Sequence, residues 1–165
     1  MATNVKPIPE GHHTVTPYLV LNDTTRAIEF YKRAFNATER VRMDAPNGKI
    51  GHAELQIGDS LIMLGDEMPG SSARSPQSLG GTCVGIFLYV KDVDTAFQKA
   101  LDAGARVEQP LQDMFWGDRY GKLTDPFGHS WSIATHKEDV APAEMQKRMQ
   151  VAMAKMGEPR TKTAT

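Results

Sequence analysis

The feature that most constrains the fold is a repeat inside the chain. Residues 18–37, YLVLNDTTRAIEFYKRAFNA, and residues 86–105, IFLYVKDVDTAFQKALDAGA, both read as an apolar strand, an aspartate and a helical segment. When Asp23 is laid on Asp92, the two copies are 69 residues apart. A repeat of this kind indicates two copies of one supersecondary unit. The chain is therefore expected to fold as two similar modules.

Each copy predicts a helix that begins after its aspartate. The carboxylates of Asp23 and Asp92 can accept hydrogen bonds from the first exposed N–H groups of a helix. Apolar residues then recur at helical spacing in both copies. They are Ala27, Ile28, Tyr31 and Phe35 in the first copy, and Val93, Ala96, Phe97, Ala100 and Leu101 in the second. Gly104 is a typical helix stop.

Short strand-like segments follow each helix. The first copy has turn signals at residues 46–48 (PNG) and at Gly58-Asp59, and the second has one at residues 125–128 (DPFG). Each unit therefore reads β-α-β-β-β. A ferredoxin-like α+β dimer is the rival fold, but it needs two helices in each unit and fits this pattern poorly.

These patterns divide the chain into six segments. We expect a lead at 1–13, a first module at 14–68, a Ser/Gly/Pro-rich linker at 69–81, a second module at 82–139, a C-terminal helix at 140–157 and a disordered tail at 158–165. In the C-terminal helix, Met145, Met149, Met153 and Met156 form an apolar stripe. The stripe predicts a helix that docks on this chain or on a dimer partner, and a ligand-binding methionine face is the alternative.

Composition excludes several classes of protein. The chain has 165 residues and a formal net charge of −1, so no basic excess points to nucleic acid. No apolar run approaches the roughly 18 residues of a membrane span, and the N-terminus has no apolar stretch of signal-peptide type. The single cysteine, Cys83, rules out an internal disulfide framework. These features favour a cytoplasmic protein.

Two β-α-β-β-β units in succession resemble the vicinal oxygen chelate superfamily, which includes glyoxalase I, extradiol dioxygenases and bleomycin-resistance proteins. The residues that carry the resemblance are TPYLVLNDTTRAIEFYKRAF, GHAELQIGDSLIMLGDE, VKDVDTAFQKALDAGA and MFWGDRYGKLTDPFGHSWSIATHKED, within 15–139. Among its branches the chain looks most like the PhnB-like one. The resemblance implies an α+β fold in which two tandem modules form a curled, barrel-like mixed sheet. Helices would cover its convex side, and the concave faces would make a central cleft for a ligand.

Side chains alternate across a strand, so the apolar positions can be assigned to the helix-covered face and their neighbours to the cleft. In residues 52–57, Ala53, Leu55 and Ile57 are expected to be buried. A two-residue turn at Gly58-Asp59 would place Glu54 opposite Met63. The predicted ligand-binding residues are Tyr18, His52, Glu54, Met63, Phe87, Tyr89, Trp116, Asp118, Tyr120, Lys122 and Ser132.

The resemblance also implies where a metal would bind. Metal-using members take one ligand from the first strand and one from the last strand of each module. The matching positions here are Thr16, Met63, Gly85 and Ser132. None offers the carboxylate or imidazole that divalent cations prefer. We therefore expect no metal and no other cofactor, and a divalent metal in a shifted site is the alternative.

Two groups of residues are candidates for chemistry. His52 and Glu54 point to the same side of a strand and could hold a metal, act as a base with an orienting group, or only line a wet cleft with Glu54 bonded to Lys122 or a tyrosine. The segment DMFWGDRY, 113–120, brings Phe115, Trp116 and Tyr120 around Asp118. Aromatic rings with one fixed polar group are typical of a small-molecule pocket, although they could equally close the end of the barrel.

Three functions follow as hypotheses. The first is a small-molecule binding protein, glyoxalase/bleomycin-resistance-like, without the usual metal. The second is a lyase, isomerase or dioxygenase that uses a shifted metal site or acid–base chemistry of Glu54 and His52. The third is a structural dimer with a vestigial cleft. A homodimer is expected in each case, because curled sheets leave open edges that need covering.

Overall fold

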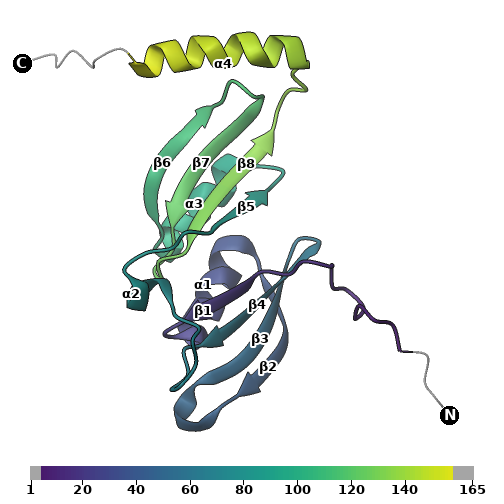
Figure 1. Ribbon diagram of the computed structural model, residues 1–165, viewed down its shortest axis with the longest axis vertical. Coiled ribbons are helices and arrows are strands. Elements are labelled where there is room, and N and C mark those ends of the chain that lie inside the picture. Colours follow the sequence, from purple (N-terminus) through teal and green to yellow (C-terminus); the bar gives the residue numbers. More distant parts are fainter. Residues whose placement is uncertain (1–4, 158–165) are drawn as a thin grey trace, which may run out of the picture.

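The computed structural model describes residues 5–157, with side chains described up to Ala154. It contains two modules, one above the other in Figure 1. The first comprises β1 (Tyr18–Leu21), α1 (Thr24–Phe35), β2 (Thr38–Asp44), the 3₁₀ turn η1 (Pro46–Gly48), β3 (Ile50–Ile57) and β4 (Ser60–Asp66). The second comprises β5 (Gly85–Tyr89), α3 (Val93–Ala103), β6 (Arg106–Asp113), β7 (Asp118–Thr124) and β8 (Ser130–His136). The short α2 (Pro76–Leu79) lies between them, and α4 (Pro142–Gly157) follows.

The two modules have the same topology. The first sheet has the order β1-β4-β3-β2 and the second has β5-β8-β7-β6. In each sheet the first and last strands of the module pair in parallel, and the other neighbours are antiparallel. The α+β fold of two tandem β-α-β-β-β modules is therefore confirmed. The two sheets remain separate four-stranded sheets, and they do not close into one barrel.

Both helices begin as the sequence predicts. The Asp23 carboxylate accepts a hydrogen bond from the N–H of Arg26, and the Asp92 carboxylate accepts one from the N–H of Thr95. In each module, a side chain from the last strand also accepts a hydrogen bond from the N–H of the first residue of the helix. Asp66 does so at α1 and Thr135 at α3, and these two residues are again 69 positions apart. The repeat thus extends to how each helix is fixed to its sheet.

The turn at Gly58-Asp59 sets the register of β3 and β4. Gly58 has φ of 59°, a left-handed conformation that glycine adopts without a steric penalty. The turn pairs Ile57 with Ser60 and therefore Glu54 with Met63, as predicted. The alternation of burial along β3 also follows the prediction, with its apolar side chains buried and His52, Glu54 and Gln56 partly exposed.

The modules pack together through their helix-covered faces. The indole ring of Trp131, which is 1% exposed, lies 5.3 Å from the ring of Tyr31 and 4.5 Å from that of Phe35. The carboxylate of Asp125 accepts hydrogen bonds from the hydroxyl of Tyr31 at 2.6 Å and from the indole N–H of Trp131 at 3.0 Å. One continuous core therefore joins both modules. It holds the open faces of the two sheets in fixed positions.

Three segments differ from the sequence interpretation or extend it. The linker contains a helical turn, α2, which begins at Pro76 after the Ser75 side chain has accepted a hydrogen bond from Ser78 N–H. The strand β1 begins only at Tyr18, so Thr16 precedes it. The C-terminal helix forms and lies across the far end of the second module (Figure 1), with Met149 and Met153 38% and 63% exposed. The predicted disordered tail lies outside the described residues.

Candidate functional site

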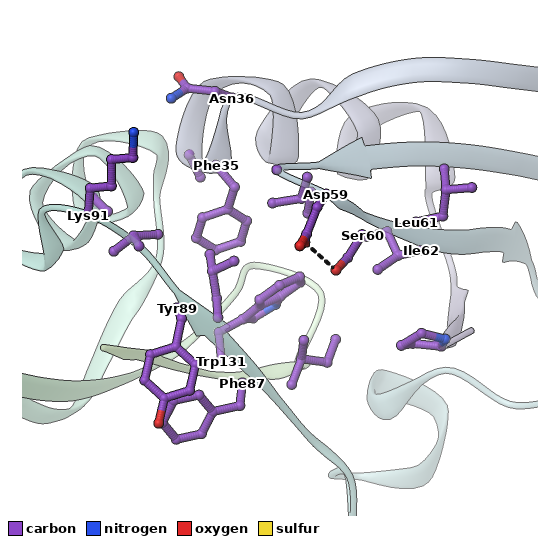
Figure 2. Close-up of a pocket in the computed structure, with 18 of the residues that line it drawn as sticks. Phe35, Asn36, Asp59, Ser60, Leu61, Ile62, Phe87, Tyr89, Lys91 and Trp131 are labelled. Carbon is purple, nitrogen blue, oxygen red and sulfur yellow. Dashed lines mark hydrogen bonds between the residues drawn. The ribbon is translucent and has the colours of Figure 1, made fainter. Parts of the chain in front are cut away.

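A groove of about 1080 Å³ opens between the two modules. Figure 2 shows it, with Phe35 and Trp131 at its centre, Leu61 and Ile62 on one side, and Phe87 and Tyr89 on the other. Side chains from both faces of β5 line the groove, so it follows the open edge of that strand. Volumes of this size are at the upper end of small-molecule pockets, which are typically about 300–1,000 Å³.

The predicted ligand-binding residues do not form one cleft within the chain. They fall into two patches on the open faces of the two sheets, and of all eleven only Phe87 and Tyr89 line the groove. The acid–imidazole patch, on the first sheet, consists of Tyr18, His52, Glu54 and Met63. The aromatic patch, on the second sheet, consists of Phe87, Tyr89, Trp116, Asp118, Tyr120, Lys122 and Ser132. Among the described residues, no hydrogen bond or ring contact joins the two patches.

The acid–imidazole patch centres on Glu54. One carboxylate oxygen, Oε1, lies 3.3 Å from Nε2 of His52 and 3.4 Å from Nε2 of His12. The Glu54 side chain is only 14% exposed. The ring of Tyr18 lies 5.9 Å from that of His52, and partial burial raises the pKa of its hydroxyl. The hypothesis that Glu54 binds Lys122 or a tyrosine is wrong, because its partners are the two imidazoles.

The aromatic patch is a connected set of rings. Phe87 lies 4.8 Å from Tyr89 and 5.8 Å from Tyr120, against which it stacks at an interplanar angle of 26°. The ring of Trp116 meets that of Tyr120 edge-on at 5.7 Å. Phe87 and Tyr89 remain 49% and 61% exposed. Exposed aromatic side chains that pack on one another present ring faces to a ligand or a partner.

A buried carboxylate holds the end of this patch. Asp118, at the start of β7, is 3% exposed. Its Oδ2 accepts hydrogen bonds from the Tyr89 hydroxyl at 3.0 Å and from the Trp116 indole N–H at 2.9 Å. Its Oδ1 lies 2.8 Å from Nδ1 of His136. The hydrogen bond to Asp118 raises the pKa of Tyr89, so this hydroxyl stays protonated at neutral pH.

The remaining polar groups of the aromatic patch are also paired. The hydroxyls of Tyr120 and Ser132 lie 3.0 Å apart. Lys122 lies opposite Ser132, as the turn at Asp125 predicts, and its ammonium is 2.7 Å from the carboxylate of Glu108. This contact raises the pKa of Lys122. The two hydroxyls share one hydrogen bond, so one hydroxyl hydrogen is left for a ligand.

The positions where the superfamily holds a metal do not fit one in this chain. β1 pairs Tyr18 with Met63, and β5 pairs Phe87 with Ser132, so the residues opposite Met63 and Ser132 are Tyr18 and Phe87, not Thr16 and Gly85. A phenol, a thioether, a phenyl ring and a hydroxyl make a poor donor set for a divalent cation. Within residues 5–157, no three His, Cys, Asp or Glu side chains are arranged to hold a metal ion. The absence of a metal cofactor stays a prediction.

Sequence reasoning missed four residues near the patches. His12 precedes the first strand, and its side chain is 15% exposed and contacts Glu54. His129 follows the turn at residues 125–128, and its Nε2 lies 3.2 Å from the carbonyl oxygen of Val20 in the other module. Glu108 and His136 pair with Lys122 and Asp118, which the sequence did predict as ligand-binding residues. No pattern in the sequence identifies these two partners by itself.

The model of the "Glyoxalase/Bleomycin resistance protein/Dioxygenase superfamily" matches residues 11–133. The chain belongs to this superfamily. An uncharacterized protein of Mycobacterium tuberculosis is 46% identical over 152 residues, which cover 90% of this chain and 86% of the relative.

Solved structures of other proteins have the same fold. TioX from Micromonospora sp. ML1 is 32% identical with a TM-score of 0.61, and the match covers 75% of this chain and 98% of TioX. A PhnB protein from Bacillus cereus is 18% identical with a TM-score of 0.59, and the match covers 74% of this chain and 99% of that protein. At this identity the likeness shows the fold alone. The superfamily match ends before α4, which starts at Pro142. No helix in the described part of the chain is long and apolar enough to cross a membrane.

Proposed function

We propose that this superfamily member binds a planar, aromatic small molecule on its aromatic patch and needs no metal to do so. The observation that carries the proposal is the set of rings around Phe87, which remain half exposed although they pack on one another. A flat ligand that covers these ring faces would remove apolar surface from water and gain aromatic contacts.

The position of Ser132 supports binding without a metal. It stands at the last-strand position where metal-using members place a ligand, and its hydroxyl faces that of Tyr120. A hydroxyl pair can fix one polar atom of a ligand by a hydrogen bond, which a cation would otherwise fix by coordination. The aromatic rings would then set the plane of the ligand, and the hydroxyl pair its orientation.

A homodimer is part of the proposal. The exposed apolar residues Val15, Phe87 and Tyr89 line the groove beside the open edge of β5, with Val15 82% exposed. Exposed apolar patches and open strand edges are typical of surfaces that another chain covers. A second copy at this groove would cover Val15 and the β5 edge. The location of the dimer is proposed to be the cytoplasm.

Binding can be tested with two lactones of the same ring skeleton, one flat and aromatic and the other saturated. Coumarin is flat and aromatic, whereas octahydrocoumarin keeps the same lactone on saturated rings. We expect coumarin to bind and to change the fluorescence of Trp116, and octahydrocoumarin to bind far more weakly. The variant Phe87→Leu should weaken coumarin binding by about 2- to 12-fold, because an aromatic contact contributes about 0.5–1.5 kcal/mol beyond its area.

The matched control is Leu79→Ala in α2, which removes an apolar side chain that is 68% exposed and belongs to neither patch. This variant should bind coumarin as the wild type does. Equal binding of the two lactones by the wild-type protein would contradict a stacked ligand.

A second function has one observation in its favour. Glu54 is mostly buried between two imidazoles, an arrangement that suits a general base with an orienting partner. On this alternative the protein is a metal-free lyase or isomerase, and Glu54→Gln would abolish turnover while leaving coumarin binding intact. The binding function is preferred because the rings are exposed and Glu54 is not.

A further inference from the structure

We infer that Asp118 is a positioning residue of the aromatic patch rather than a ligand contact, and that the patch selects an uncharged planar ligand. This inference rests on the proposed binding function and names the class of ligand. The sequence placed Asp118 among the ligand-binding residues, where an exposed carboxylate would favour a cation. The structure gives it a different set of neighbours.

The carboxylate is placed out of reach of a ligand by the turn before it. The N–H of Met114 donates to the carbonyl of Asp118, and the N–H of Gly117 donates to the carbonyl of Met114. Gly117 has φ of 99°, and a Cβ at this position would collide with the backbone of Glu138. This tight turn directs the Asp118 side chain inward, where only 3% of the residue is exposed.

Side chains from three elements donate to Asp118, and two of these side chains belong to the aromatic patch. The Tyr89 hydroxyl comes from β5, the Trp116 indole from the turn before β7, and the His136 imidazole from β8. A buried carboxylate is stable only when hydrogen bonds replace its water, so the rings and the carboxylate hold each other in place. Without Asp118, the Tyr89 hydroxyl and the Trp116 N–H would each lose their acceptor, and the rings would lose their fixed orientation.

The same bonds limit what the patch can offer a ligand. The Tyr89 hydroxyl and the Trp116 N–H are occupied by Asp118. The two charged residues of the patch, Asp118 and Lys122, are paired with His136 and Glu108. A charged ligand would therefore give up its water without meeting an unpaired opposite charge. The ring faces attract cations, but the buried Asp118 carboxylate cannot reach the surface to complete a cation site.

Two groups of the patch can still donate a hydrogen bond to a ligand. The hydroxyl pair of Tyr120 and Ser132 can donate one hydrogen. The ammonium of Lys122, whose side chain is 38% exposed, has N–H groups beyond the one that meets Glu108. A carbonyl or ring nitrogen on a flat, neutral molecule satisfies either donor. The class of ligand is therefore an uncharged, planar aromatic compound with a hydrogen-bond acceptor.

The experiment compares coumarin with 1-naphthylmethylammonium, a cation of similar size, on three proteins. The wild type should bind coumarin more tightly than the cation. Asp118→Ala should weaken coumarin binding by about 10-fold or more, because hydrogen bonds to a charged group are lost. Asp118→Asn should stay within about 3-fold of the wild type, because the amide oxygen still accepts from Tyr89 and Trp116. Rescue by asparagine, together with a Trp116 emission spectrum like that of the wild type, distinguishes positioning from charge.

Asp66→Ala is the matched control. Asp66 is another buried aspartate, 8% exposed, that accepts hydrogen bonds in the first module from Thr24 and Ile50. Its loss should lower thermal stability and leave coumarin affinity unchanged. If Asp118→Ala fails to fold, two measurements still test the inference. They are the preference of the wild type between coumarin and the cation, and the coumarin affinity of Asp118→Asn.

Each outcome bears on a different statement. Tighter binding of the cation, lost in Asp118→Asn, would overturn the inference and make Asp118 a ligand contact. Coumarin binding that is unchanged in Asp118→Ala would overturn the positioning role while the proposed function stands. If neither planar probe binds the wild type, the proposed function fails and the ligand class fails with it.

Discussion

Removing the hydrogen bond between Tyr31 and Asp125 tests most directly how the two modules are joined. Tyr31 belongs to α1 of the first module, and Asp125 belongs to the turn between β7 and β8 of the second. Their residues are 0% and 1% exposed, and the hydroxyl lies 2.6 Å from Oδ2 of Asp125. Burial raises the pKa of Tyr31 well above its usual value, so the hydroxyl remains a donor. Tyr31→Phe removes this donor and keeps the ring.

The magnitude follows from the other bonds that Asp125 retains. A hydrogen bond to a charged group contributes about 1.5–3 kcal/mol. In Tyr31→Phe, the carboxylate still accepts from Trp131 and from two backbone N–H groups, of Phe127 and His129. We therefore expect the lower part of this range, about 2 kcal/mol, which for a chain of this size corresponds to a fall of about 4–8 °C in Tm.

Urea unfolding and thermal unfolding measure the effect. The matched control is Tyr18→Phe, which removes a hydroxyl from a residue that is 48% exposed and whose hydrogen bond to Gly51 is long, at 3.4 Å. That variant should change the free energy of unfolding by less than about 0.5 kcal/mol. A loss in Tyr31→Phe as small as in the control would refute the reasoning, and this hydrogen bond would then contribute little to joining the modules.

Three further predictions concern other parts of the molecule. Hydrogen bonds to Asp139 and Asp118 raise the pKa of His136. The stability that protonated His136 gives the fold should therefore be complete below about pH 6.5 and be lost as pH rises through the raised pKa. The Tm difference between wild type and His136→Gln should shrink from pH 5.5 to 8.5, and a constant difference would contradict this prediction. Val15→Glu should shift the proposed homodimer toward monomer in light scattering after gel filtration, whereas Leu79→Glu should not. A dimer that is unchanged in Val15→Glu would contradict an interface at Val15. Gly121→Ala should destabilise the second module by about 1–3 kcal/mol, since its Cβ would lie 2.5 Å from the ring of Phe97 in the core; unaltered urea unfolding would show that the ring can move.

Local rules account for what the sequence predicted correctly. The Gly58-Asp59 turn fixes the number of residues between β3 and β4, so the pairing of Glu54 with Met63 follows from counting. The same argument gives Lys122 opposite Ser132. The exposure of Phe87 and Tyr89 follows from alternation along β5, because their neighbours Ile86 and Leu88 pack against the core.

The parts that sequence could not give depend on how the modules sit together or on irregular backbone. Local patterns do not encode the packing of the modules through α1 and α3, so the separation of the two patches and the bond from His129 to Val20 were missed. Glu108 lies at a register shift between Val107 and Gln109, where alternation fails. His12 lies in a segment with no periodicity, so nothing in the pattern places it beside Glu54.

The central claim is that the aromatic patch binds a flat ligand without a metal ion. The decisive measurement is the affinity of one preparation for coumarin before and after exhaustive treatment with a chelator. The account predicts the same dissociation constant in both states. Binding that is lost on chelation and restored by zinc, nickel, iron or manganese would contradict it.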